Sequence, residues 1–271
     1  MLQDRGNGES ARKGKGLTAD LRKIQKRAAK ANTGNKIMDV IFPLRCPVCD
    51  RPVPYPERRQ GICPECRESF LLIKGARCCL CGRKLAGSEE ELCRDCRING
   101  GRHCYTKGIA LYEYNDMMRE AVYRFKYEGR REYAGFFGKM MARQFGNAVR
   151  RAGVEGIIPV PLHAKREAER GYNQAGLLAA AFGAEIQMPV YEKYVVRVRN
   201  TPPMKALDGA NRQNNLKKAF KIGQNDVKLN ITIIVDDIYT TGSTIDAVAG
   251  VLLEAGISRV YFMTLAIGKD F

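Results

Sequence analysis

The stretch IIVDDIYTTGST, residues 233–244, carries the pattern that decides the fold. Its β-branched start, residues 233–235, is typical of a strand buried on both faces, and the small polar residues after the two aspartates indicate a tight turn. Apolar residues recur with helical spacing from Ser243 onward, and Gly256 stands where a left-handed helix stop is expected. We therefore expect a strand, a tight loop and a helix, whose first backbone N–H groups are available to an anion.

The acidic pair at the end of this strand, Asp236 and Asp237, narrows the choice of ligand. If the loop held a phosphate, both carboxylates would lie about one sugar ring away, where vicinal hydroxyls are their natural partners. The sequence thus predicts a phosphosugar site, whose loop residues are Thr240, Thr241, Gly242, Ser243 and Thr244. The alternative is a corner without a ligand, in which Asp236 caps the turn and Ser243 caps the helix. No Walker A loop is present, since Gly-Lys-Ser/Thr does not occur in the stretch.

Composition limits the class of protein. A chain of 271 residues with 45% hydrophobic content is long enough for an α/β domain and a smaller second domain. Its formal net charge of +17 favours polyanionic ligands, either nucleic acid or a phosphorylated small molecule. Neither a run of about 18 apolar residues nor an apolar leader segment occurs, so we expect a cytoplasmic protein without a membrane span.

Eight cysteines form four Cys-x2-Cys pairs. The first tetrad comprises Cys46, Cys49, Cys63 and Cys66, and the second comprises Cys78, Cys81, Cys93 and Cys96. Paired knuckles at this separation are typical of zinc ribbons, in which four thiolates leave no open position on the metal. We expect two structural Zn2+ sites; the alternatives are one zinc site with a degenerate second tetrad, or an iron–sulfur cluster. Cys79 and Cys104 fall outside the pattern, and we expect small buried apolar residues there.

Differences in composition and in the pattern of apolar residues divide the chain into three parts. Residues 1–35 are polar and basic, so we expect a disordered extension; the alternative is an arm that binds nucleic acid or a partner. Residues 36–104 hold the cysteines and few apolar residues, so metal binding would supply the folding free energy that a thin core cannot. This part also contains many arginines, such as Arg51 and Arg83. We expect them to form either a binding surface or a solvated face. Residues 105–271 show an α/β pattern.

Within this last part, apolar runs predict the main elements. Strands are expected over 109–114, 157–163 and 260–267, and helices over 117–125 and 133–148. Residues 197–215 have turn chemistry without periodicity and are a candidate lid.

A basic segment follows the strand that ends near His163, for which we expect a structural hydrogen bond. We expect a loop there, carrying Lys165, Arg166 and Arg170. Because ligands collect at the carboxyl ends of strands in an open α/β sheet, this loop should share a rim with Asp236. The alternative is a solvated cationic loop.

Four motifs in this order resemble the ComF/GntX family: the double zinc ribbon, PVPLH with ERGYNQ (159–163 and 169–174), RVRNTPP (197–203) and VDDIYTTGST (235–244). The resemblance covers about residues 37–267 and leaves out 1–35. It implies a twisted parallel sheet flanked by helices, like that of type I phosphoribosyltransferases, preceded by a small double zinc-ribbon domain.

The resemblance also implies a site for phosphoribosyl pyrophosphate (PRPP). In phosphoribosyltransferases the acidic pair binds the 2′- and 3′-hydroxyls of the ribose, the loop after it binds the 5′-phosphate, and an earlier loop binds pyrophosphate with Mg2+. The candidate catalytic residues are therefore Asp236, Asp237, Arg166 and Arg170. No acceptor pocket is recognisable, so the acceptor stays unknown.

Some family members take part in natural transformation and handle incoming single-stranded DNA. The resemblance thus implies single-stranded DNA as a second partner, and a competence helicase or another DNA-uptake protein as a third. We expect an accessory protein that binds PRPP and single-stranded DNA; the alternative is an active phosphoribosyltransferase on an unidentified base or amine. A PRPP-sensing regulator is less favoured, because no helix-turn-helix is visible.

Overall fold

The computed structural model describes residues 43–70, 72–87, 89–199, 218–223 and 226–268. The chain divides into two compact units, Met1–Leu44 and Arg45–Phe271. The expected extension over 1–35 and residues 200–215 of the candidate lid lie outside the described residues. The larger unit therefore carries the fold and the sites that follow.

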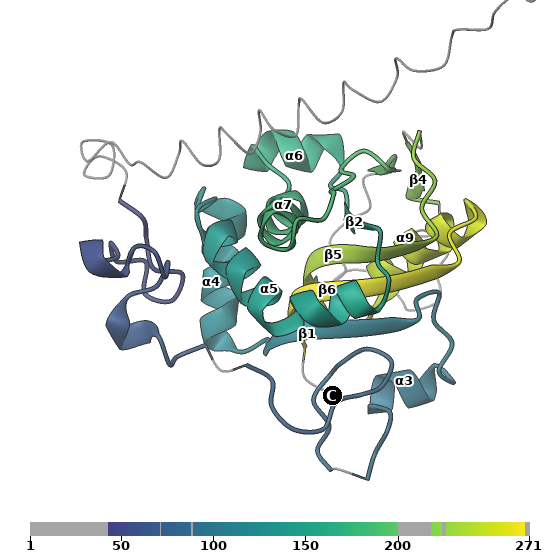
Figure 1. Cartoon of the computed structure of the whole chain (residues 1–271), viewed down its shortest axis with the longest axis horizontal. Coiled ribbons are helices and arrows are strands. Elements are labelled where there is room, and N and C mark those ends of the chain that lie inside the picture. Colours follow the sequence, from purple (N-terminus) through teal and green to yellow (C-terminus); the bar gives the residue numbers. More distant parts are fainter. Residues whose placement is uncertain (1–42, 71, 88, 200–217, 224–225, 269–271) are drawn as a thin grey trace, which may run out of the picture. The chain divides into compact units, whose positions relative to one another are not determined.

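A parallel sheet forms the centre of the larger unit, with the strand order β1-β6-β5-β2 (Figure 1). Its strands are β1 (Lys107–Glu113), β2 (Gly156–Pro159), β5 (Ile231–Tyr239) and β6 (Arg259–Ile267). Most of β5 and β6 is buried, which is typical of parallel strands covered on both faces. A parallel bridge between Ile157 and Val190 extends the sheet beyond β2.

Helices cover both faces of the sheet. They are α4 (Asp116–Tyr127) and α5 (Tyr133–Arg151) between β1 and β2, α6 (Ala164–Arg170) and α7 (Gln174–Ile186) after β2, and α9 (Ser243–Glu254) between β5 and β6. The step from β1 to β2 crosses the sheet in the opposite direction to the step from β5 to β6. Right-handed crossovers therefore place their helices on opposite faces. Figure 1 shows α5 and α7 on one face and α9 on the other, which confirms the predicted helix-flanked parallel sheet.

The packing of α5 on α7 depends on a small residue. A Cβ atom at Gly138 would lie 2.5 Å from Ala181 Cβ, so only glycine permits this approach of the two helices. The aromatic side chains of α5 are part of the core, where Phe137 and Tyr133 are buried.

Shorter elements complete the unit. β3 (Val195–Arg197) and β4 (Phe220–Ile222) form an antiparallel pair beside the main sheet. The cysteine-rich part contains α3 (Arg94–Ile98) and the 3-10 turns η1 (Tyr55–Glu57) and η2 (Pro64–Cys66). Among the described residues, no helix combines the length and the apolar character needed to span a bilayer.

The basic segment after His163 differs from its prediction. Residues 164–170 form the helix α6, whereas a loop was expected. All seven of these residues, in the sequence AKREAER, are strong helix formers, and the preceding prolines obscured this preference. His163 caps the helix, because its Nδ1 accepts a hydrogen bond from Lys165 N at 3.3 Å, and Gly171 ends it with φ +75°. The structural role expected for His163 is thus confirmed.

Candidate metal centres and phosphosugar site

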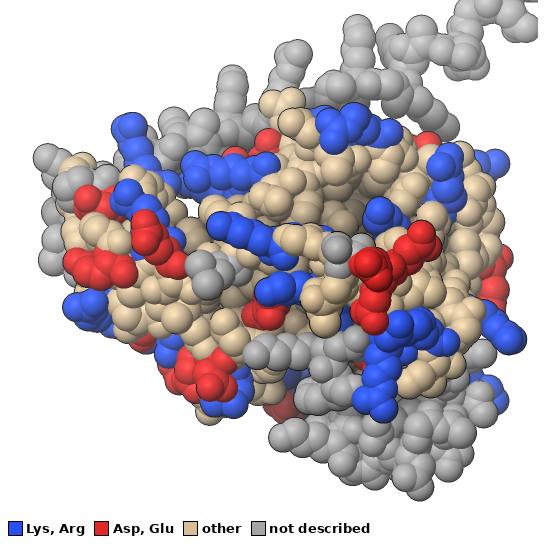
Figure 2. Space-filling view, turned by 90° about the horizontal axis from the view of Figure 1, so that it is seen from below, with Lys and Arg blue, Asp and Glu red and all other residues tan. Residues whose placement is uncertain are grey.

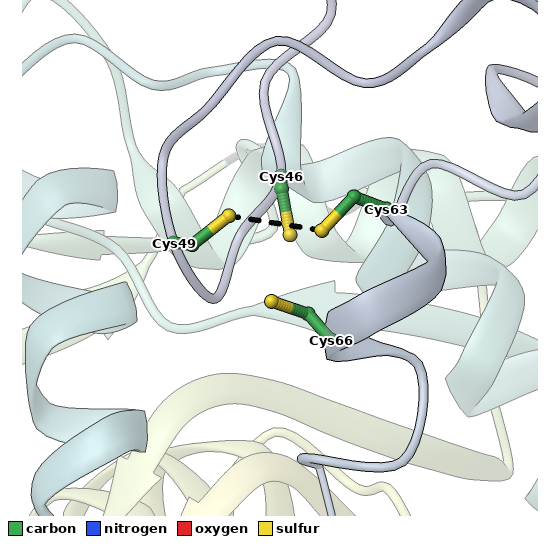
Figure 3. A group of neighbouring side chains, drawn as sticks. All are labelled: Cys46, Cys49, Cys63 and Cys66. Carbon is green, nitrogen blue, oxygen red and sulfur yellow. Dashed lines mark hydrogen bonds between the residues drawn. The ribbon is translucent and has the colours of Figure 1, made fainter.

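Both predicted cysteine tetrads are assembled. In each, the four Sγ atoms lie within 4.8 Å of one another. Figure 3 shows the first tetrad, where a loop places Cys46 and Cys49 opposite Cys63 and Cys66 at the 3-10 turn η2. The Cys49–Cys63 and Cys81–Cys93 Sγ distances are 3.7 and 3.6 Å. Thiolates on a tetrahedral zinc ion lie about 3.8 Å apart, given Zn–S bonds of about 2.3 Å. The two donor sets therefore fit Zn2+.

Neither of the two remaining cysteines is fully buried, although the sequence predicts burial for both. Cys79 is exposed and Cys104 is half-buried, whereas small buried residues were expected. Cys79 follows a ligand directly, and a knuckle turn directs its side chain outward while Cys78 and Cys81 point to the metal position.

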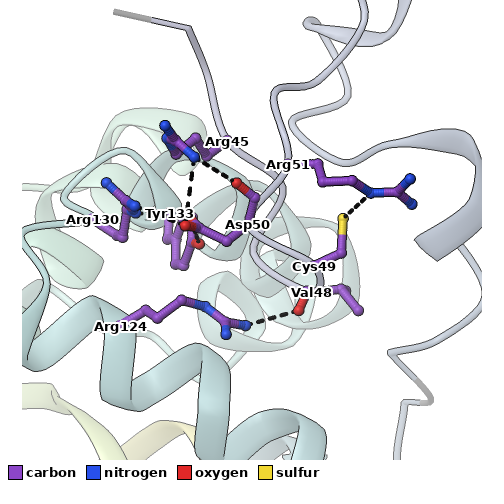
Figure 4. A network of polar contacts seen from close by, with 8 residues as sticks. All are labelled: Arg45, Val48, Cys49, Asp50, Arg51, Arg124, Arg130 and Tyr133. Atoms are coloured by element: carbon purple, nitrogen blue, oxygen red, sulfur yellow. Dashed lines mark hydrogen bonds and ion pairs between the residues drawn. The ribbon is translucent and has the colours of Figure 1, made fainter.

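The first zinc ribbon, residues 46–66, attaches to the connection between α4 and α5 (Figure 4). Asp50 accepts two hydrogen bonds from the Arg130 guanidinium, at 2.8 and 2.7 Å, and one from the Tyr133 hydroxyl at 2.6 Å. Arg124 Nη2 donates to Val48 O at 2.8 Å. The charge-assisted bidentate pair fixes the orientation of this ribbon as well as its position.

The phosphosugar loop follows β5 directly. Because β5 continues to Tyr239, Asp236 and Asp237 belong to the end of the strand, and the turn is confined to residues 240–242. Gly242 adopts φ +81°, and a Cβ atom there would collide with the Tyr239 hydroxyl. It is the N-cap of α9 and provides no side-chain hydrogen bond. The first N–H groups of α9 therefore have no side-chain cap at this position, as an anion site requires.

Hydroxyl groups surround the turn. Thr240 and Thr241 are exposed, and Ser243 and Thr244 are half-buried. Thr241 Oγ1 and Ser243 Oγ lie 3.0 Å apart. The alternative in which Ser243 caps the helix is not observed, because Gly242 occupies the N-cap and Ser243 is the first helical residue.

The two carboxylates have different environments. Asp237 Oδ2 pairs with Lys126 Nζ at 2.6 Å, and Asp237 is 8% exposed. Burial lowers the pKa of Lys126, but the charge and the hydrogen bond of Asp237 outweigh it, so this pKa lies above its usual value. Burial, followed by the negative charge of Asp237, raises the pKa of Asp236 to about 7. The pair thus combines one carboxylate held by an ammonium group with one that titrates near neutral pH.

The basic residues of α6 lie on the side of the sheet that carries this pair. The positive charge of Arg170 acts on Lys126, which contacts Asp237. Burial lowers the pKa of Arg197, the charge of Arg166 lowers it further, and Asp236 opposes both effects. Arg166 and Arg170 therefore lie within electrostatic range of residues beside the acidic pair. Lys165 is exposed, and only its backbone N–H makes a hydrogen bond that is described.

The sequence does not predict the contacts or the burial of three residues in this region. Lys126, at the end of α4, carries no motif, and no sequence signal pairs it with a residue more than a hundred positions away. Arg197 belongs to the RVRNTPP motif, whose sequence indicates only a candidate lid. Arg83 has no sequence feature that distinguishes it from the other arginines around the cysteines, yet it is 2% exposed.

The chain was compared with family models, solved structures and curated proteins. A model of the double zinc ribbon domain matches residues 37–97, which confirms the predicted ribbons. Solved phosphoribosyltransferases are structural neighbours of the chain. A purine phosphoribosyltransferase from Pyrococcus horikoshii Ot3 has 17% identity and a TM-score of 0.30 over 51% of this chain and 72% of that chain. An adenine phosphoribosyltransferase from Saccharomyces cerevisiae has 17% identity and a TM-score of 0.30 over 48% and 69%.

Curated relatives match most of the chain. Competence protein ComFC of Bacillus subtilis (strain 168) is 32% identical over 209 residues, covering 73% of this chain and 80% of that protein. Competence protein F of Haemophilus influenzae is 28% identical, covering 75% and 96%. DNA utilization protein YhgH of Escherichia coli (strain K12) is 28% identical, covering 74% and 94%. With two cysteine tetrads ahead of a helix-flanked parallel sheet, this chain belongs to the ComF/GntX family.

Proposed function

We propose that the chain binds PRPP or a related phosphosugar at the carboxyl end of β5. The observation that carries the proposal is the left-handed Gly242 between an acidic strand end and the start of α9. It leaves N–H groups for a phosphate on one side and the Asp236–Asp237 pair for sugar hydroxyls on the other.

In the proposed complex, the residues 240–244 hold the 5′-phosphate through N–H and hydroxyl donors. Asp236 and Asp237 accept hydrogen bonds from the ribose hydroxyls, and the ion pair with Lys126 holds the Asp237 side chain in place. Arg166 and Arg170 neutralise the pyrophosphate, and Mg2+ would supply further charge neutralisation when bound with it. A transfer reaction would need this stabilisation as the bond from C1 of the ribose to pyrophosphate breaks and the acceptor forms the new bond to C1.

Isothermal titration calorimetry with PRPP and Mg2+ tests the site. We expect wild type to bind, and the double variant Asp236→Asn/Asp237→Asn to lose binding, since amides cannot replace both charged acceptors. Asp116→Asn is a matched control, because the Asp116 side chain is 90% exposed and pairs with Arg119 at the surface of α4. Equal affinity in wild type and the double variant would reject the site.

We further propose that single-stranded DNA binds across the exposed end of α4, next to the phosphosugar site. Tyr123 and Tyr127 are 52% and 59% exposed, with ring centroids 5.1 Å apart. The Arg170 guanidinium lies over the Tyr127 ring at 4.9 Å. Exposed aromatic rings beside cationic side chains are the features that bind single-stranded nucleic acid without sequence preference. Figure 2 shows one face of the molecule, on which acidic side chains are mixed with basic ones.

Fluorescence anisotropy with a labelled oligo-dT tests this surface. Tyr127→Ala should weaken binding by about 1–3 kcal/mol, the usual contribution of one stacked base. The matched control is Tyr55→Ala, which removes a 69% exposed tyrosine beside Arg58 in the first ribbon. Affinity should also fall linearly with salt on logarithmic axes. An unchanged affinity in Tyr123→Ala/Tyr127→Ala would reject the surface.

These two sites suggest an accessory protein of DNA uptake, in line with the competence proteins among its relatives. The second candidate is an active phosphoribosyltransferase, favoured by the neighbouring acidic pair and α6 arginines. Release of pyrophosphate from PRPP in the presence of a panel of bases and amines separates the two. Binding without release for any acceptor would support the accessory role.

A further inference from the structure

We infer that the second zinc ribbon, residues 78–96, positions the phosphosugar loop, with Arg83 and His103 as positioning residues. The inference rests on the proposed function of that loop. It assigns to this ribbon a role beyond folding its own segment, because two of its connections end at opposite ends of the loop.

The first connection runs through Arg83. Its backbone is part of the knuckle turn, where Cys78 N donates to Arg83 O at 2.7 Å. Its buried guanidinium donates from Nη2 to Thr240 O at 2.9 Å and pairs with Asp95 at 3.0 Å. The acceptor is the backbone of the first residue after β5. Arg83 therefore fixes the position of the chain where the loop begins.

The second connection runs through His103. Its Nε2 lies 3.6 Å from Sγ of the ligand Cys96, and its Nδ1 lies 2.8 Å from Asp246 Oδ2. Cys104 N also donates to Asp246 Oδ1 at 2.8 Å. Asp246 lies in the first turn of α9. Side chains that form hydrogen bonds with metal ligands commonly fix the orientation of those ligands. Here the same geometry links a zinc ligand to the helix that begins at the loop.

The two connections bracket residues 240–246, and a third contact supports them. Tyr105 follows the second ribbon, and its hydroxyl lies 2.8 Å from the Tyr239 hydroxyl, at the end of β5. A phosphate site needs several N–H groups held in converging directions before the ligand arrives. A loop fixed at both ends by a metal-supported segment meets that requirement. The positioning residues need not touch the phosphosugar.

Hydrogen–deuterium exchange of the full chain, followed by mass spectrometry, tests the inference without a ligand. Arg83→Gln should raise exchange of peptides covering 240–246 by about tenfold or more, as expected when a hydrogen bond to a charged group is lost. Arg77→Gln is the matched control. Arg77 also lies next to the second tetrad, but it donates to Ala110 O at 2.9 Å and to Ile73 O, away from the loop. It should leave 240–246 unchanged.

Three further readouts separate positioning from folding. Zinc content should stay at two ions per chain in both variants. PRPP affinity should fall about tenfold in Arg83→Gln only, and Arg83→Lys should restore part of it because an ammonium group can still donate to Thr240 O. If Arg83→Gln loses zinc, His103→Gln provides the second test, with increased exchange expected at the start of α9.

The outcomes are distinguishable. Unchanged exchange of 240–246 in zinc-loaded Arg83→Gln and in His103→Gln would overturn the inference. A wild-type protein that does not bind PRPP would reject the proposed function, while the exchange measurement would still decide whether the ribbon orders the loop.

Discussion

The two zinc ribbons have the same ligands but different attachments to the sheet domain. The first contacts the α4–α5 connection through a bidentate ion pair between Asp50 and Arg130, with both side chains partly exposed. The second contacts the phosphosugar loop through the almost fully buried Arg83 and through His103. A metal ion fixes the local fold of either segment, but the side chains around it decide which part of the protein that segment stabilises.

This difference separates two proposed surfaces. α4, held by the first ribbon through Arg124, also carries Tyr123 and Tyr127 of the proposed DNA surface. The loop held by the second ribbon belongs to the proposed phosphosugar site. Lys126 of α4 joins the two, because it pairs with Asp237. We therefore expect damage to the first ribbon to affect DNA binding more than PRPP binding, and damage to the second to do the reverse.

The largest effect is expected from removing one ligand of each tetrad in turn. Structural zinc contributes about 10–16 kcal/mol of binding free energy in zinc-finger peptides, so either change should lower the melting temperature markedly. Cys66→Ser and Cys81→Ser should each reduce zinc from two ions to one in elemental analysis. Only Cys81→Ser should increase exchange of residues 240–246. Equal increases in both variants would break the comparison, and iron without zinc in wild type would overturn the metal assignment.

Detaching the first ribbon without touching its metal should have the next largest effect. Asp50→Asn removes the charged acceptor of Arg130 and Tyr133, which should cost about 2–3 kcal/mol in the free energy of unfolding measured with urea. Zinc content and PRPP affinity should remain those of wild type. A loss of PRPP affinity as large as that of Arg83→Gln would show that both ribbons support the phosphosugar site.

The pH dependence of PRPP binding should come from Asp236 on β5 and should not require the first ribbon. Since the pKa of Asp236 is raised to about 7, affinity should increase up to about tenfold per pH unit until pH 7, as this carboxylate ionises. The free energy of unfolding should change with pH in the opposite direction to the PRPP affinity. A folded-state pKa above the unfolded value favours the folded state at low pH, and this contribution is lost as the pH rises through about 7.

Titration calorimetry would measure the PRPP affinity between pH 5.5 and 8, and scanning calorimetry would measure the stability over the same range. This range spans the raised Asp236 pKa of about 7. Asp236→Asn should abolish the pH dependence of stability in this range, whereas Asp50→Asn should retain it. A pH-independent affinity in wild type would contradict the assignment of Asp236 to the binding site.

The smallest effect is expected for Tyr105→Phe, which removes one buried hydrogen bond to Tyr239 at the base of the loop. We expect a loss of about 1 kcal/mol in stability and a small rise in loop exchange. Tyr112→Phe is the control, because the Tyr112 hydroxyl is buried and has no hydrogen-bond partner in the part of the chain that the structure describes. Equal losses in the two variants would argue against a supporting role for Tyr105.

The sequence by itself predicted those features that depend on local spacing. The four CxxC pairs indicated two tetrads, because a knuckle turn needs only nearby residues. The apolar run before Asp236 and the glycine after it indicated the strand, turn and helix, since strand burial and left-handed turns have strong local preferences. Local preference also explains the error at the helix α6, because the preceding prolines favour a loop whereas the seven residues of the helix are good helix formers.

Only the tertiary structure decided which residues meet. Lys126 contacts Asp237 across 111 positions, and Arg83 contacts Thr240 across 157 positions. Such pairs leave no periodic trace in a single sequence, because the crossovers of the sheet and the folds of the ribbons set their separation. Burial also decided what these residues do. Arg83 resembles many exposed arginines in sequence, but it is buried in the structure, where its guanidinium is a hydrogen-bond donor to the backbone.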